Sequence, residues 1–324
     1  ANLVRKIKTL KNYRQDKNLE AVYSTEELAK LILKELVNIE LQNMSQQFLV
    51  NLKALGFEPD CEERFNSMLI GGEGIVLVSG PTGSGKTTTL YSTLNKLESP
   101  DVNIVTVEDP IEYDLDNINQ AQINAKSGVT FASALRSILR QDPDIIMVGE
   151  VRDEETVELG IRAALTGHLV FSTVHTNDAA SGFTRLLNWN VEPFLIASTV
   201  KGILAQRLVR MICKECKKPH EPSNEELKML GLETGDTIKA FSGKGCLSCR
   251  NTGFKGRIGI YELLLVDAEI SELVLGQAPG YKIREKARDN GMRTLLEDGI
   301  IKIERGDTTI SEIYETLGTT KIIL

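Results

Sequence analysis

The sequence predicts an α/β protein with a largely parallel β-sheet that helices cover. Short β-rich runs alternate with helical patterns through the middle of the chain. One of these runs leads directly into a glycine-rich loop of the kind that binds phosphate, and two Cys-x-x-Cys pairs follow later in the chain. We expect a partial helical N-terminal region and linker at 1–70, an α/β core at 71–210, a tetracysteine element at 211–256 and a C-terminal helical subdomain at 257–324.

Composition sets loose limits on function. The chain has 324 residues, of which 41% are hydrophobic and 26% charged, as in ordinary globular proteins. No stretch approaches the roughly 18 apolar residues of a membrane span, so we expect contact with a membrane to go through partners. A formal net charge of -7 disfavours a broad nucleic-acid surface. Because the chain begins at Ala1 without Met, it is expected to be processed, truncated or incomplete at this end.

The expected elements follow from periodicity and capping patterns. Ser24 with Glu27 forms a capping box before an amphipathic helix that runs to about Ile39, and a second helical stretch stops at Gly56. In the core we expect a helix at Thr87–Leu97 and strands at Ile75–Ser79, Ile104–Val107, Ile145–Val148 and Leu169–Thr173. A glycine-rich link at Thr252–Gly259 precedes further helices, one of them capped by Thr309 with Glu312.

The loop after the first core strand matches G-x-x-x-x-G-K-[ST] and opens a helical run, which is the context that this motif requires. Glycines let its backbone N–H groups face a phosphate chain, Lys86 reaches the β/γ oxygens, and the Thr87 hydroxyl ligates Mg²⁺. The alternative is a chance glycine turn. The expected ATP-binding residues are Gly80, Pro81, Thr82, Gly83, Ser84, Gly85, Lys86, Thr87 and Thr88.

Two acidic sites follow core strands. Glu150 comes just past the strand Ile145–Val148, where open α/β sheets place ligands, so we expect it on the metal side of the nucleotide. A solvated loop charge is the alternative. The run Glu108–Glu112 after the strand Ile104–Val107 either orients the attacking water or is an acidic turn before proline, and both interpretations stay open.

The cysteines predict a structural zinc site. Cys213, Cys216, Cys246 and Cys249 form two Cys-x-x-Cys pairs, and four thiolates give a closed tetrahedral site. Two redox pairs or inert thiols are the alternative. Cys61 is expected to be a small core residue, and His220 a surface side chain rather than a ligand.

Four long motifs occur in the order seen in secretion ATPases of the GspE/PilB type, which the chain therefore resembles from roughly Leu55 to Gly318. They are Gly80–Thr87, Val107–Tyr113, Leu135–Asp153 and Thr166–Asn177. The resemblance implies a RecA-like P-loop NTPase core in a hexameric ring that hydrolyses ATP between subunits. It implies that Glu112 is the catalytic base, Glu150 the Walker B carboxylate and His175 a γ-phosphate contact. It leaves the role of His168 open, with a core histidine as the alternative for both histidines.

The resemblance also implies a biological role. A cytoplasmic homohexamer would power pseudopilus assembly in type II secretion or type IV pilus extension, attached to inner-membrane platform and assembly proteins without binding nucleic acid. The tetracysteine element resembles the assembly branch of the family. Two rival functions are a RecA-like nucleic-acid translocase and a nonhydrolysing ATP-binding regulator of assembly.

Overall fold

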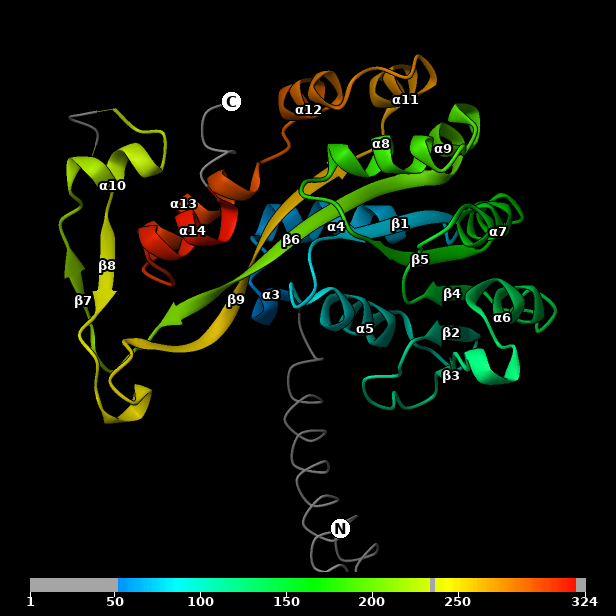
Figure 1. Ribbon diagram of the computed structural model, residues 1–324, viewed down its shortest axis with the longest axis horizontal. Coiled ribbons are helices and arrows are strands. Elements are labelled where there is room, and N and C mark those ends of the chain that lie inside the picture. Colours follow the sequence, from blue (N-terminus) through cyan, green and yellow to red (C-terminus); the bar gives the residue numbers. More distant parts are fainter. Residues whose placement is uncertain (1–51, 234–236, 319–324) are drawn as a thin grey trace, which may run out of the picture. The chain divides into compact units, whose positions relative to one another are not determined.

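The computed structural model describes residues 52–233 and 237–318 (Figure 1). They fall within one compact unit of the chain, Leu49–Leu324. The capping box predicted at Ser24 and Glu27 lies outside the described residues. Within the described ranges, no helix is long and apolar enough to cross a bilayer.

A mixed sheet forms the centre of the described residues, with the strand order β3-β2-β4-β5-β1-β6-β9. Neighbouring strands are parallel except β6 and β9, which pair antiparallel. The strands of this sheet are β1 (Gly74–Ser79), β2 (Ile104–Glu108), β3 (Asn119–Gln122), β4 (Ile145–Val148), β5 (Leu169–Val174), β6 (Val200–Ile212) and β9 (Phe254–Leu265). The α/β fold with a largely parallel sheet is therefore confirmed.

The four strands expected in the core are β1, β2, β4 and β5, and each end differs from the prediction by at most one residue. Every residue in these strands is buried. Continuous apolar runs are typical of parallel strands that are covered on both faces, which explains why the pattern was readable.

Helices cover both faces of the sheet. One apolar cluster joins the sheet to α6, α7, α8, α9, α11 and α12, and a second joins the opposite face to α3, α4 and α5. The helices of these layers are α3 (Leu52–Leu55), α4 (Pro59–Leu69), α5 (Lys86–Leu97), α6 (Phe131–Ile138), α7 (Glu154–Leu165), α8 (Ala180–Asn188), α9 (Pro193–Thr199), α11 (Ala268–Leu275) and α12 (Gly280–Asp289), with a 3-10 turn η2 (Ala125–Ser127) before α6. The expected helix after the phosphate loop is α5.

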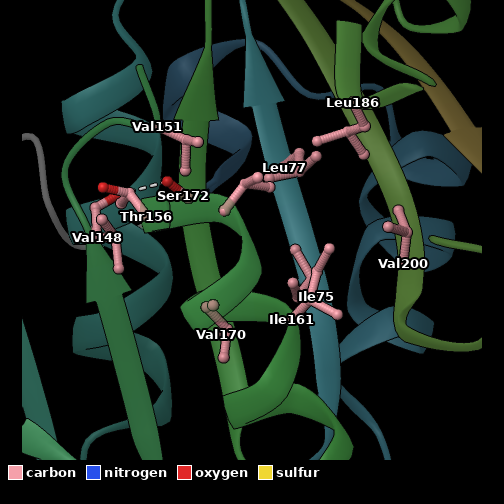
Figure 2. Close-up of a pocket in the computed structure, with 12 residues that line it drawn as sticks. Ile75, Leu77, Val148, Val151, Thr156, Ile161, Val170, Ser172, Leu186 and Val200 are labelled. Carbon is pink, nitrogen blue, oxygen red and sulfur yellow. Dashed lines mark hydrogen bonds between the residues drawn. The ribbon is translucent and has the colours of Figure 1, made fainter. Parts of the chain in front are cut away.

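A small cavity of about 10 Å³ lies between α7 and the strands β1, β4 and β5 (Figure 2). Apart from Thr156, Gly160 and Ser172, the residues around it have aliphatic side chains. The hydroxyl of Ser172 does not face it unpaired, because Ser172 Oγ donates to the carbonyl of Val148 at 2.7 Å. The cavity offers a water molecule no partners, so we treat it as a dry packing defect.

The strands β6 and β9 are much longer than the other strands and stay paired from Gly202↔Leu265 to Ile212↔Phe254. The prediction of a glycine-rich link at Thr252–Gly259 is therefore wrong from Phe254 onward, where β9 begins. Gly259 makes room for a neighbour: a Cβ there would lie 2.3 Å from the hydroxyl oxygen of Tyr261. Gly259 thus serves close packing within a strand rather than a linker.

Both long strands cross boundaries predicted between domains, β6 at 210/211 and β9 at 256/257. The tetracysteine element is therefore continuous with the main sheet through two paired strands (Figure 1). The division into four regions stays a prediction.

A third apolar cluster joins the far ends of β6 and β9 to the C-terminal helices. Its surroundings include β7 (Lys217–His220), β8 (Ala240–Gly243), α10 (Asn224–Met229), α13 (Leu295–Arg305) and α14 (Ile310–Leu317). Thr309 caps α14 as expected, because its hydroxyl accepts the N–H of Glu312 at 3.3 Å. The reciprocal bond of the predicted capping box is absent: the Glu312 carboxylate instead binds the backbone N–H and guanidinium of Arg210.

Candidate nucleotide site and metal centre

The phosphate loop joins β1 to α5 at the carboxyl edge of the sheet. Gly80, Gly83 and Gly85 have positive φ values of 153°, 79° and 86°. Gly80 is required sterically, since a Cβ there would lie 2.5 Å from Ser84 Oγ and 2.6 Å from the carbonyl oxygen of Gln206. The loop is thus held tightly from its inner side, and Gly83 faces open space.

Lys86 curls back over this loop. Its Nζ donates to the carbonyl oxygens of Gly80 at 2.8 Å and Pro81 at 3.1 Å. Burial lowers the pKa of Lys86, the negative charge of Glu150 opposes that shift, and the positive charge of Arg207 adds to it. A phosphate group would replace the two carbonyls as the partner of this ammonium.

Glu150 and His175 meet beside the loop. They follow the neighbouring parallel strands β4 and β5, whose carboxyl ends share one edge of the sheet. The Glu150 side chain is 14% exposed, pairs with Arg152, and lies with Oε2 3.5 Å from His175 Nε2. The structure thus brings Lys86, Glu150 and His175 into one electrostatic environment.

The acidic run after β2 contains two different carboxylates. Glu108 is buried and saturated, because it accepts from the hydroxyls of Tyr91 and Thr106 and from Gln120 Nε2 at 3.1 Å. Glu112 is exposed, and its side chain makes no hydrogen bond or ion pair within the described residues. Glu108 therefore ties β2 to α5 and β3, whereas Glu112 is free to meet a ligand.

His168 and His175 flank β5 at opposite ends of the strand. His168 precedes β5, and its Nδ1 lies 2.8 Å from the carbonyl of Ala163 and 3.1 Å from Thr166 Oγ1, at the end of α7. It thus contacts a helix terminus at the amino edge of the sheet, away from His175. We assign it a structural role.

Sequence reasoning missed a buried polar group beside the loop. Gln206, Arg207 and Glu262 on the long strands are each at most 7% exposed. The signal was present: a glutamine and an arginine interrupt the apolar run from Ile203 to Val209. In a strand that is buried on both faces, such residues need partners.

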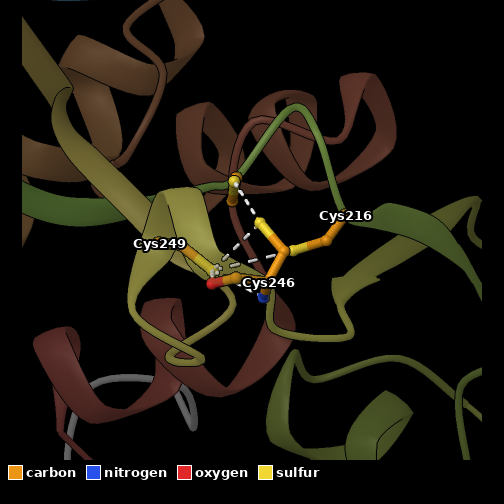
Figure 3. A group of neighbouring side chains, drawn as sticks. Cys216, Cys246 and Cys249 are labelled. Atoms are coloured by element: carbon orange, nitrogen blue, oxygen red, sulfur yellow. Dashed lines mark hydrogen bonds between the residues drawn. The ribbon is translucent and has the colours of Figure 1, made fainter.

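The four predicted zinc ligands converge. The Sγ atoms of Cys213, Cys216, Cys246 and Cys249 all lie within 4.8 Å of one another (Figure 3). The separations are 3.8 Å for Cys213–Cys246, 3.9 Å for Cys216–Cys249 and 3.7 Å for Cys246–Cys249. A tetrahedron of thiolates around Zn²⁺ at about 2.3 Å has edges of about 3.8 Å, so these residues fit the ion.

Backbone N–H groups stabilise Cys249 as a thiolate. Cys249 Sγ accepts from the N–H groups of Cys246 at 3.2 Å and Gly253 at 3.3 Å. Burial acts to raise the pKa of Cys249, but these donors and the neighbouring thiols hold it at about 6. The second knuckle is organised by η3 (Leu247–Cys249), so the site is built from local turns at the ends of β6 and β9.

Cys61 is a core residue as expected, and the His220 side chain is partly exposed. Cys61 is buried in the cluster under α4, and burial raises its pKa to about 12, which makes it an inert core residue. His220 lies outside the cysteine cluster and pairs through Nε2 with Glu226 at 2.9 Å.

Comparison with known proteins agrees with the motifs. A family model described as "Type II/IV secretion system protein" matches residues 16–315. The type IV pilus assembly ATPase PilB of Thermus thermophilus is 49% identical over 81% of this chain and 30% of its own length. The type II secretion system ATPase E of Vibrio cholerae is 46% identical over 82% of this chain and 52% of its own length.

Solved structures give the same fold. The pilus retraction motor PilT with bound ADP matches with a TM-score of 0.62 and 29% identity, over 84% of this chain and 68% of that chain. The Legionella pneumophila ATPase DotB matches with a TM-score of 0.58 and 25% identity, over 82% of this chain and 64% of that chain. The chain spans about half or less of the lengths of the two curated relatives named above. On the match to residues 16–315, it belongs to the Type II/IV secretion system protein family.

Proposed function

We propose that this chain is the ATP-hydrolysing motor subunit of a machine that assembles a type II secretion pseudopilus or extends a type IV pilus. The observation that carries the proposal is the position of Lys86, above a glycine-rich phosphate loop and in the field of Glu150, which lies beside His175. This edge of a largely parallel sheet is where α/β folds bind ligands. The names of the relatives supply the biological role.

The residues divide the work as follows. Backbone N–H groups in the loop Gly80–Thr88 and the Lys86 ammonium would bind the phosphates of ATP, and the Thr87 hydroxyl and Glu150 would hold Mg²⁺. When bound, Mg²⁺ neutralises charge that develops on the phosphate oxygens. His175 contacts the γ-phosphate. Glu112 accepts the proton of the attacking water, and its carboxylate, which is exposed and has no hydrogen bond or ion pair in the described part of the chain, supports that assignment.

Assembly and location belong to the same proposal. The subunit forms a homohexamer, works in the cytoplasm, and is held at the inner membrane by platform and assembly proteins. Its tetracysteine element holds one Zn²⁺ as a structural ion, because four thiolates leave no position for water.

Steady-state phosphate release from Mg-ATP separates this function from its rivals. A motor is expected to turn over ATP without DNA and to show no stimulation when DNA is added. DNA stimulation would favour the translocase, and binding without release would favour a regulator. Co-purification with inner-membrane assembly proteins then distinguishes secretion from pilus extension.

A further inference from the structure

Strand β6 carries two consecutive polar residues that are almost fully buried. Gln206 is 1% exposed and Arg207 is 7% exposed. Side chains alternate along a strand, so Gln206 lies on the face of Leu204, which packs in the α5 cluster, and Arg207 on the face of Ala205, which packs in the α8 cluster. The pair therefore reaches both faces of the sheet from one point on its backbone.

Gln206 supports the phosphate loop from below. Its Nε2 donates to the carbonyl oxygen of Ser84 at 2.7 Å, and a Cβ on Gly85 would lie 3.2 Å from the same nitrogen. Gln206 Oε1 and Ser84 Oγ are both buried and have no hydrogen-bond partner within the described residues. Unpaired buried polar atoms are costly, so their position against the loop calls for a role beyond packing.

Arg207 joins the same backbone to the segment after β5. One guanidinium nitrogen donates to the carbonyl of Gln206 at 3.0 Å, and the other terminal nitrogen donates to the carbonyl of Asn177 at 2.8 Å. Burial lowers the pKa of Arg207, while the charges of Glu262 and Asp178 oppose that shift. Asn177 comes two residues after His175, so this segment touches the nucleotide site at one end.

The other end of the segment holds the C-terminal helices. Asp178 Oδ2 pairs with a terminal guanidinium nitrogen of Arg284 on α12 at 2.8 Å. Glu262 accepts the N–H of Ala179 at 2.8 Å and that of Leu295, the first residue of α13, at 3.4 Å. The contacts from Ser84 to α12 are thus polar, buried or half-buried, and consecutive.

Nucleotide binding would change this series of contacts where it begins, at the phosphate loop. Lys86 now donates to the loop carbonyls of Gly80 and Pro81, and phosphate oxygens would take that ammonium. The released loop lies against Gln206, since Gly80 fits there only without a side chain. A shift of the loop would therefore act on the Gln206 carbonyl, which accepts from the Arg207 guanidinium.

We propose that Gln206 and Arg207 are positioning residues that couple nucleotide occupancy of the phosphate loop to α12, through Asn177 and Asp178. The inference rests on the nucleotide site of the proposed function but does not require hydrolysis. Coupling of this kind is a difference in free energy between two states of α12, which nucleotide and α12 contacts both bias.

Hydrogen–deuterium exchange of α12 amides with and without Mg-AMP-PNP tests the coupling. In the wild-type chain we expect the nucleotide to change α12 exchange rates by about threefold or more. Arg207→Lys keeps the charge but lacks the planar fork that reaches two carbonyls, so the change should vanish while nucleotide affinity stays within about threefold. Arg284→Gln should have the same effect from the other end.

A control arginine lies on the same helix. Arg288 makes an exposed ion pair with Glu297 at 2.8 Å and takes no part in the contact chain, so Arg288→Gln should keep the nucleotide response. Gln206→Met, which preserves volume, gives a second variant should Arg207→Lys not fold. Folding is checked by the melting temperature of each variant.

The outcomes separate this inference from the proposed function. An α12 response that persists in Arg207→Lys and Gln206→Met, or a wild-type chain that binds AMP-PNP without any α12 response, overturns the coupling. A wild-type chain that shows the response but releases no phosphate from ATP contradicts the motor function and supports the coupling. A wild-type chain that binds no nucleotide contradicts both.

Discussion

Replacing Gly160 with alanine should stabilise the protein, because the structure has room for a methyl group at that position. Gly160 is buried within α7 and lines the cavity of about 10 Å³ against the sheet. A Cβ there would meet only Val170 Cγ1, at 3.9 Å, which is ordinary van der Waals contact. The backbone of Gly160 has no positive φ that would oppose alanine.

The magnitude follows from two contributions. Alanine is favoured over glycine inside a helix by about 0.8–1 kcal/mol, and burial of one methyl-sized group adds up to about 0.8 kcal/mol. We expect Gly160→Ala to raise the free energy of unfolding by about 1–1.5 kcal/mol. For a chain of this size, that corresponds to a rise of roughly 2–6 °C in the melting temperature.

Thermal unfolding by circular dichroism without nucleotide measures the effect, and a second helical glycine gives the control. Gly182 in α8 is buried, but a Cβ there would lie 2.7 Å from Ile203 Cδ1, so Gly182→Ala forces that side chain to move. Gly160→Ala should be the more stable variant. A melting temperature below that of the wild type, or equal to that of Gly182→Ala, would refute the cavity argument.

Three further predictions concern charge and metal. Burial of Glu312 acts to raise its pKa, but Arg210 holds that pKa below its usual value of 4.5. The stability that this contact contributes is therefore present above pH 4.5 and is lost as the pH falls through the lowered pKa. Glu312→Gln should thus weaken the pH dependence of the free energy of unfolding in urea between about pH 5 and 3. Glu112→Gln should bind Mg-ATP and release phosphate about 10²-fold more slowly. Glu150→Gln should instead change how the rate of phosphate release depends on Mg²⁺ concentration, and the same Mg²⁺ dependence in both variants would contradict these separate roles. One zinc per chain is expected by elemental analysis, and Cys213→Ser should release it while nucleotide binding persists; a disulfide between the paired cysteines would contradict this.

The parts of the fold that could be predicted are those with a local signal. The strands β1 and β4 are short and contain the continuous apolar runs Ile75–Val78 and Ile145–Val148, because both of their faces are covered, so burial is visible in consecutive residues. The long strand β9 contains Gly256 and Gly259, which also mark turns and links in sequence patterns. Its pairing with β6 joins residues that are more than forty positions apart.

In the candidate site, too, the residues in local motifs could be predicted and the contacts between distant parts of the sequence could not. The phosphate loop and the cysteine pairs are local motifs, so their residues could be named from spacing alone. The contacts of Gln206 depend on a bond to Ser84 that spans 122 residues of sequence. The same limit applies to the carboxylates after β2: Glu108 and Glu112 look alike in sequence, and only the positions of Tyr91 and Gln120 show which one is saturated.

The central claim is that Lys86 and its loop form the site at which Mg-ATP binds and is hydrolysed. The most direct test is calorimetric binding of Mg-ATP to the wild-type chain and to Lys86→Ala, with phosphate release followed on the same samples. The account predicts saturable binding and turnover in the wild type, and strongly weakened binding without turnover in Lys86→Ala, because loop amides cannot replace the ammonium charge. Wild-type turnover in Lys86→Ala would contradict it.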